Sequence, residues 1–234
     1  MGVKEAVAAL RSGKPVLLFD SEDREGETDL VFASQFADSA AIRMLRKEAG
    51  GLVCVAMPYS IAEYLGIPFM TEVYRNSGMK IFDMLNDRDV KYDSKSSFSI
   101  TVNHRNTFTG IPDNDRALTV TEFSNVAALA ARGDSRAVKE FTENFRSPGH
   151  VHLLIGDRNM IAERRGHTEL SLALAEIGGL VPCTTIAEML GEDGKSLAKR
   201  DAIEYACRSG IEFVEGKEVV GEYLKRRQGW DIQQ

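Results

Sequence analysis

The sequence predicts one domain, residues 1–234, in which helices and strands interleave along the whole chain. Three observations support this fold class. Short apolar runs of strand length alternate with stretches that repeat apolar residues at helical spacing. No internal repeat and no linker rich in Pro, Gly or Ser divides the chain. The length is sufficient for one good-sized hydrophobic core, so a single α/β-type domain is the simplest interpretation.

The first quarter of the chain gives clear local signals. An apolar stripe with helical spacing predicts a helix over Val3–Arg11 that ends near Gly13. Continuous apolar runs predict buried strands, and Asp38 or Ser39 is placed to cap a further helix. The elements expected after the first helix are strands Pro15–Phe19, Leu30–Phe36 and Leu52–Met57, and a helix that reaches Glu48 before Gly50 and Gly51.

The signals weaken in the middle of the chain and return after it. Residues 58–97 mix turn residues with short apolar pieces and predict no firm structure. A loop is expected over Thr109–Arg116, which is rich in Gly, Pro, Asp and Asn. The other expected elements are strands Ser99–Val102 and Val151–Ile155, and helices Thr121–Ala131, Ser135–Asn144, His167–Ile177, Ala202–Arg208 and Lys217–Lys225.

The composition argues against several classes of protein. Hydrophobic residues make up 43% and charged residues 27%, as in ordinary globular proteins. The net charge of -6 and a pI of about 5.4 argue against a nucleic-acid partner. No window approaches ~18 consecutive apolar residues, so no membrane span is expected. Charges inside the first apolar run argue against a signal peptide.

The cysteines give an expectation about the compartment. Cys54, Cys183 and Cys207 are far apart and form no CxxC pair, so neither a disulfide framework nor a cysteine zinc site is expected. A reducing cytoplasm fits this pattern best. Cys183 and Cys207 are expected in the core, and Cys54 is expected to be buried within an apolar strand.

The densest chemical signal is FDSEDREGETDL, residues 19–30, with six acidic residues in ten positions. If its second half is extended, Glu25, Glu27 and Asp29 point the same way, because side chains alternate along a strand. Three carboxylates on one face repel one another unless a cation or an arginine offsets them, and oxygen ligands suit Mg²⁺ or Mn²⁺. From charge alone, a solvated hairpin tip is about equally plausible.

A second signal is ERRGHTELSLALAEIGG, residues 163–179, where an amphipathic helix is expected to start at His167. A helix N-terminus offers free N–H groups and a positive dipole end, which favour a phosphate. Arg164 and Arg165 would add bidentate hydrogen bonds to it, Thr168 a hydroxyl, and His167 a metal ligand. The alternative is an ordinary helix start in which Thr168 and Glu169 serve only as caps.

Other candidate residues have weaker signals. His150 and His152 have strand spacing and would share one face as a metal chelate, or as one functional histidine and one packed partner. His104 is expected at the surface. Glu188 lies in an apolar stretch, where it either faces solvent or has a raised pKa suited to acid–base chemistry. The dinucleotide, P-loop, zincin and hydrolase motifs are absent.

Five segments in this order carry a resemblance to a known family: FDSEDREGETDLVFASQ, AGGLVCVAM, FTGIPDNDRALTV, RSPGHVHLL and RRGHTELSLALAEIGGLVPCTTIAEML. They resemble the 3,4-dihydroxy-2-butanone 4-phosphate synthases, and residues 70–105 look more like archaeal members than bacterial ones. No second cyclohydrolase domain is expected, so the resemblance is to single-domain members. It implies an α+β domain with a mixed, twisted β-sheet flanked by helices, working as a homodimer with sites near the interface.

The same resemblance implies roles for particular residues. Glu25 and His167 would hold Mg²⁺ or Mn²⁺, and His150 and Glu188 would be needed for catalysis. A loop that contains Thr109 would close over the substrate. Asp20, Glu27 and Cys54 match further active-site positions. The residues that would contact ribulose 5-phosphate are Arg24, Glu25, Asp29 and Glu188, with its phosphate held by Arg164, Arg165, Gly166, His167 and Thr168.

The implied reaction converts ribulose 5-phosphate into 3,4-dihydroxy-2-butanone 4-phosphate and formate, an early step toward riboflavin. A metal chelated by the substrate would stabilise an enediolate, and Glu27, Asp29 or Glu188 would take the first proton. Loss of water, a skeletal shift and release of one carbon follow. The alternatives are another metal-dependent sugar-phosphate isomerase or aldolase, which would release no formate, and a non-catalytic nucleotide- or RNA-binding module.

Overall fold

The computed structural model describes residues 2–85, 93 and 96–231. Within them, seven strands form one sheet in the order β4-β5-β3-β6-β2-β1-β7. β1 pairs with β7 and β3 with β5 in parallel, whereas the other neighbours are antiparallel. The expected mixed sheet is therefore confirmed. The strands are β1 (Val16–Phe19), β2 (Thr28–Ala33), β3 (Cys54–Met57), β4 (Phe98–His104), β5 (Phe145–Ile155), β6 (Thr184–Glu188) and β7 (Glu212–Glu215).

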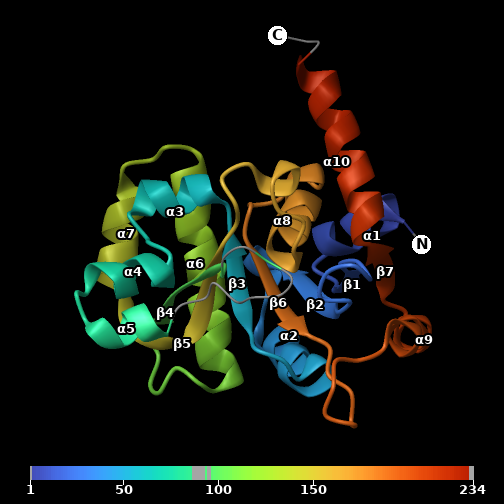
Figure 1. The fold of residues 1–234 in the computed structure, drawn as a ribbon, viewed down its shortest axis with the longest axis horizontal. Helices are drawn as coiled ribbons and strands as arrows, with labels where there is room; N and C mark the ends of the chain where they lie inside the picture. Colours follow the sequence, from blue (N-terminus) through green and yellow to red (C-terminus); the bar gives the residue numbers. More distant parts are fainter. Residues whose placement is uncertain (1, 86–92, 94–95, 232–234) are drawn as a thin grey trace.

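Helices cover both faces of this sheet, and Figure 1 shows the strands running between two groups of helices. One face packs against α2, α3, α6, α7 and α9, and the other packs against α1, α8 and α10. The α-helices are α1 (Val3–Arg11), α2 (Ser39–Met44), α3 (Tyr59–Leu65), α4 (Met70–Asn76), α5 (Lys80–Met84), α6 (Asp113–Ala131), α7 (Arg136–Asn144), α8 (His167–Ile177), α9 (Lys199–Ser209) and α10 (Gly216–Asp231).

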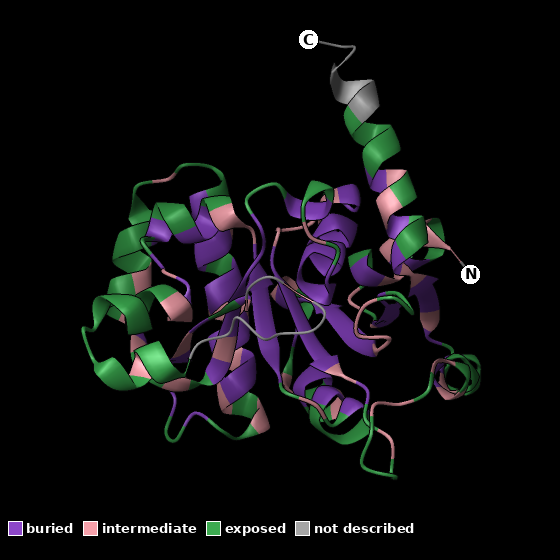
Figure 2. Cartoon of the chain, in the orientation of Figure 1, coloured by how far each residue is buried: buried purple, intermediate pink, exposed green. Residues whose placement is uncertain are grey.

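Strands β1, β2 and β3 are buried at every position, because helices cover both faces of the sheet (Figure 2). In β1, Leu17 and Phe19 point into the core on the face covered by α9, and Val16 and Leu18 point into the core on the face covered by α1 and α8. Leu17 and Leu18 are both 0% exposed, and burying each contributes about 1.5–3 kcal/mol. A continuous apolar run in the sequence thus corresponds to a strand whose side chains alternate between two hydrophobic cores, one on each face of the sheet.

Helix α8 is buried almost all round, which the sequence did not predict. Ten of its eleven residues are buried, because it lies between the sheet on one side and α1 and α10 on the other. The expectation of an amphipathic helix was wrong. This placement matters for the site, because side chains at the start of α8 point into the protein and not into solvent.

Several boundaries differ from the expected ones. β2 begins at Thr28 and ends at Ala33, and a π-helical turn over Leu45–Ala49 continues α2. Helix α6 begins at Asp113, eight residues before the expected start at Thr121. Pro112 precedes its first turn, and two acidic residues there favour a helix N-terminus electrostatically. The second half of the segment Thr109–Arg116, which was expected to be a loop, is therefore the start of a helix.

Two expectations about exposure were wrong. His104 is 6% exposed and packs edge-on against Phe145, because β4 continues past the expected end at Val102. Cys207 is exposed on α9 and does not lie in the core. Cys54 and Cys183 are buried as expected.

The C-terminal helix α10 packs through Val219 and Tyr223 at its start and then projects beyond the other elements (Figure 1). In the part of the chain that the structure describes, none of the helices has the length and hydropathy to cross a membrane.

Candidate active site

One cavity of about 440 Å³ lies where the β1–β2 loop, the end of β6 and the start of α8 meet. Carboxylates and arginines dominate its polar lining, and the sheet supplies an apolar floor. The lining residues are Arg24, Glu25, Glu27, Asp29, Asp93, Ser96, Ser97, Phe98, Leu154, Arg164, His167, Thr168, Ile186 and Glu188. The acidic loop and the helix start, 140 residues apart in the sequence, are therefore brought together.

Asp20 organises the acidic loop from inside. It is 3% exposed, and its two carboxylate oxygens accept the backbone N–H groups of Glu25 and Glu27, each at 3.1 Å. The N–H of Asp20 itself donates to the carbonyl oxygen of Glu27 at 3.2 Å. Gly26 has a φ of 68°, a left-handed conformation that favours glycine. The loop is thus a folded turn and not a solvated tip.

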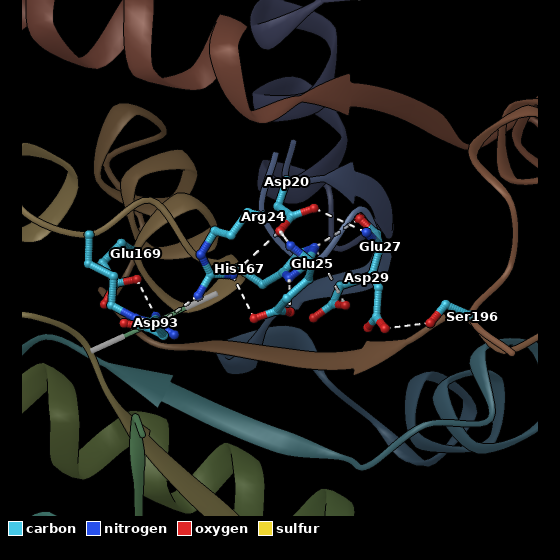
Figure 3. A network of polar contacts seen from close by, with 10 residues as sticks. Asp20, Arg24, Glu25, Glu27, Asp29, Asp93, His167, Glu169 and Ser196 are labelled. Carbon is cyan, nitrogen blue, oxygen red and sulfur yellow. Dashed lines mark hydrogen bonds and ion pairs between the residues drawn. The ribbon is translucent and has the colours of Figure 1, made fainter. Parts of the chain in front are cut away.

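Glu25, Glu27 and Asp29 all line the cavity, although Glu25 lies in the turn before β2 and not in an extended segment. His167 Nδ1 lies 3.3 Å from Glu25 Oε2, and its Nε2 lies 3.7 Å from Asp29 Oδ1. Burial lowers the pKa of His167, but the charges of Asp29 and Glu25 outweigh this and raise it to about 9. Burial raises the pKa of Asp29 to about 7. Figure 3 shows these side chains converging.

The donor set fits a divalent cation. Asp20, Glu25 and His167 each offer one ligand atom, and these atoms lie within 4.8 Å of one another. Asp20 already accepts two backbone N–H groups, which leaves Glu25 and His167 as the better ligands. Carboxylate oxygen with imidazole nitrogen suits Mg²⁺ or Mn²⁺. The surplus of negative charge around His167 gives a cation an electrostatic reason to bind.

Two arginines form the opposite end of the cavity. Arg24 Nη2 lies 2.8 Å from Asp93 Oδ2, and Arg164 Nε lies 2.5 Å from the same oxygen. One carboxylate oxygen thus bridges two guanidinium groups, so this end of the cavity accepts an anion. The N-terminus of α8 adds the hydroxyl of Thr168, which also lines the cavity.

Gly166 allows the two arginines to approach the backbone. A Cβ atom there would lie 2.5 Å from Arg164 Nη1 and 2.8 Å from Arg24 Nη2. Only glycine leaves space for both guanidinium groups in front of α8. The neighbouring Arg165 is exposed and donates from Nε to the carbonyl oxygen of Ile161 at 3.4 Å, outside the cavity lining.

The third side of the cavity is the end of β6. Glu188 Oε2 accepts the N–H of Leu52 at 2.7 Å, so its carboxylate is held in place. Gly51 lies against it, because a Cβ atom at that position would be 2.2 Å from Glu188 Oε2. Cys54 is 2% exposed, and burial together with the charge of Glu188 raises the pKa of its thiol. Cys54 does not line the cavity.

Two candidate residues lie elsewhere in the same chain. Asn103 connects them: its Oδ1 accepts the N–H of His150 at 2.8 Å, and its Nδ2 donates to the carbonyl oxygen of Thr109 at 3.4 Å. His150 and Thr109 are exposed and do not line the cavity. They form a second group next to Phe108, which is 94% exposed.

Comparison with known proteins identifies the family. The family model described as 3,4-dihydroxy-2-butanone 4-phosphate synthase matches residues 4–222. An enzyme of that name from Archaeoglobus fulgidus is 45% identical over 229 residues, 96% of this chain and 95% of that protein. One from Methanothermobacter thermautotrophicus is 42% identical over 228 residues, 96% of this chain and 97% of that protein. The chain belongs to the 3,4-dihydroxy-2-butanone 4-phosphate synthase family. The expected archaeal type is confirmed.

Solved synthase structures have the same fold. The enzyme of Candida albicans is 26% identical and superimposes with a TM-score of 0.75, covering 96% of this chain and 97% of that one. A synthase solved in complex with two magnesium ions is 21% identical with a TM-score of 0.76, covering 96% and 97% of the two chains. The sheet and both helix layers are therefore those of the synthase fold.

Sequence reasoning missed three polar residues at this synthase site. Asp93 bridges the arginines, Glu169 binds Arg164, and the hydroxyl of Ser196 donates to Glu27 Oε1. Asp93 lies in a segment without a recognisable pattern. Glu169 was interpreted from the sequence only as a helix cap. However, an acidic residue at the third position of a helix can also face the loop that precedes the helix. Nothing local distinguishes Ser196 from a surface serine.

Proposed function

We propose that this chain converts ribulose 5-phosphate into 3,4-dihydroxy-2-butanone 4-phosphate and formate in riboflavin biosynthesis. One observation carries the proposal: a single cavity joins a cation site, Glu25 with His167, to an anion site, Arg24 with Arg164. A phosphorylated sugar that chelates a metal requires both features side by side. The names of the archaeal relatives, which match nearly the whole chain, support the same reaction.

Glu25 and His167 would hold Mg²⁺, with Mn²⁺ as a substitute. A bound divalent ion would polarise the substrate carbonyl and offset negative charge that develops on its oxygens. His167 is 5% exposed and held between Glu25 and Asp29, so its ring is already oriented before a cation arrives. The solved synthase with two magnesium ions supports the use of a divalent cation.

Three carboxylates are available to take a proton from the carbon next to the carbonyl: Glu27, Asp29 and Glu188. Asp29, whose pKa is raised to about 7 by burial, exchanges protons near neutral pH. Glu188 is fixed by the N–H of Leu52 and reaches the cavity from the strand side. Phe98, Leu154 and Ile186 would form an apolar floor beneath the substrate.

Arg24 and Arg164 would hold the phosphate, together with Thr168 and the N–H groups at the start of α8. Asp93 occupies this position here through one oxygen bound to both arginines. A phosphate offers more oxygens and more charge to the same donors, so it would replace that carboxylate. The distance between the proposed cation site and the proposed phosphate site would then select the length of the sugar phosphate that can bind.

We propose that the protein is a homodimer, because this would give the second group of residues a cavity in which to act. His150 and Thr109 are exposed on one chain and outside its cavity, so they would act in the cavity of the partner. The exposed Phe108 and Ile111 beside them supply apolar area for such an interface.

The protein would work in the reducing cytoplasm, consistent with its three unpaired cysteines.

Variants of the cation site test the reaction. Glu25→Gln and His167→Gln are expected to lose Mn²⁺ binding and formate release together, because both remove a ligand without removing bulk. Lys195→Ala, an exposed change outside the cavity, is the control. Normal formate release by either ligand variant would contradict the assignment of the site.

Mixing two inactive variants tests the dimer. Glu25→Gln and His150→Ala subunits, unfolded and refolded together in equal amounts, should regain about a quarter of wild-type activity. Half of the dimers are then mixed, and each mixed dimer has one intact site if the site is shared. No recovery, with proven subunit exchange, would place His150 and Glu25 in the same chain's site.

A further inference from the structure

Glu169 is a buried carboxylate for which the proposed reaction has no use. It is the third residue of α8, and its side chain is 0% exposed. An isolated buried carboxylate is strongly unfavourable, so one in this position must be fully paired. Figure 3 shows it at one end of the polar network, on the side of Asp93 and opposite to Ser196.

Both oxygens of Glu169 bind the loop that precedes α8. Oε2 accepts Arg164 Nη1 at 2.6 Å, and Oε1 accepts the backbone N–H of Asp157 at 2.8 Å. Asp157 and Arg164 are the two ends of one loop, which contains the short 3-10 helix Met160–Ala162, and the carbonyl oxygen of Met160 accepts the N–H of Arg164 at 3.0 Å. Glu169 therefore binds both ends of this loop and fixes the guanidinium group at its second end.

The orientation of Arg164 follows from this contact. Nη1 is directed at Glu169, inside the protein, and Nε is directed at Asp93 in the cavity. The guanidinium plane also passes close to Gly166, where a Cβ atom would lie 2.5 Å from Nη1. Arg164 is thus held on its inner side by a charge that solvent cannot reach, and it presents its other edge to an anion.

We propose that Glu169 is the positioning residue for Arg164 and thereby sets the affinity of the cavity for the phosphate group of its substrate. The identity of that anion rests on the proposed function; the contact itself does not. A free arginine side chain loses rotamer entropy when it binds an anion. A guanidinium group that is already fixed loses less, so the phosphate binds more tightly.

A simple capping role does not explain the geometry. A capping carboxylate binds N–H groups at the start of its own helix. Both oxygens of Glu169 instead reach the eight-residue loop from Asp157 to Arg164, which precedes the helix. The neighbouring Glu163 gives a matched comparison, because it carries the same charge one residue from Arg164 but is exposed.

Glu169→Gln keeps the size of the side chain, but an amide offers one oxygen where the carboxylate offers two. It can satisfy either Asp157 or Arg164 and not both. Calorimetric titration with inorganic phosphate is expected to show at least about tenfold weaker binding, and Mn²⁺ binding within about twofold of wild type. Glu163→Gln should leave both affinities unchanged.

A double-mutant cycle with Arg164→Gln completes the test. If Glu169 acts through Arg164, Glu169→Gln has no further effect on phosphate binding once Arg164 is replaced. Three results would overturn the proposal: unchanged phosphate affinity in Glu169→Gln, an equal loss in both backgrounds, or loss of Mn²⁺ binding or folding along with phosphate binding, which would make Glu169 a general structural residue. Failure of the wild type to release formate would refute the proposed function but would leave this cycle interpretable.

Discussion

The affinity of the site for a divalent cation should depend steeply on pH, because the proposed ligand His167 carries a proton in the metal-free protein. Asp29 and Glu25 raise the pKa of His167 to about 9. A cation that binds the ring nitrogen must displace that proton. Below pH 9 the apparent affinity is therefore expected to rise about tenfold for each pH unit, or about 1.4 kcal/mol.

Between pH 6.5 and pH 8.5 this predicts an increase of about 100-fold in the affinity for Mn²⁺. Asp29, with a pKa of about 7, becomes charged in the same interval and increases the affinity further. Titration of Mn²⁺ followed by the signal of the free ion measures the effect. Calorimetry in two buffers with different ionisation enthalpies should show that about one proton leaves for each ion bound at pH 7.5.

His167→Gln is the control for this prediction. It should bind Mn²⁺ weakly and with little dependence on pH, because the group that competes for protons is gone. The reasoning is refuted if the wild type binds Mn²⁺ equally at pH 6.5 and pH 8.5 with no proton released. If His167→Gln binds Mn²⁺ like the wild type between pH 6.5 and pH 8.5, His167 is not a ligand of the cation.

Two further changes test the support of the cavity. Ser196→Ala removes the hydroxyl that binds the carboxylate of Glu27, so it should lower kcat about tenfold with little change in KM. Ser196→Thr keeps a hydroxyl and should retain activity. Wild-type activity of Ser196→Ala would show that the contact with Glu27 is incidental. Gly51→Ala would place a Cβ atom 2.2 Å from Glu188 Oε2, so turnover should fall by at least about tenfold and Tm should drop. Gly221→Ala meets nothing within 4 Å and should behave like the wild type; equal losses in both alanine variants would contradict the argument.

The sequence predicted those parts of the site that depend on local patterns. Glu25, Glu27 and Asp29 line one cavity as expected, although Glu25 does so from a turn and not from an extended chain, and the helix start at His167 was correct. The central strand β6 was missed, although Thr184 and Thr185 are fully buried in it. Five residues give too short a pattern, and pairing with distant strands decides the conformation.

The remaining misses are contacts between residues far apart in the sequence. Asp93 and Arg164 are separated by 71 residues, and Ser196 and Glu27 by 169. Composition and spacing carry no information about such pairs. Burial of His104 was missed for a related reason, because only the pairing of β4 with β5 extends that strand to include it. Local pattern thus indicated the proposed ligands Glu25 and His167, and tertiary packing supplied the residues that contact them.

The most direct test of the proposed reaction is formate release by the purified protein from ribulose 5-phosphate, with and without Mg²⁺. The account predicts stoichiometric formate and a four-carbon phosphate ester, formed only when a divalent cation is present. Consumption of the substrate without formate would contradict the proposed reaction and favour an isomerase or aldolase. Formate release that is unaffected by removal of all divalent cations would contradict the role of Glu25 and His167.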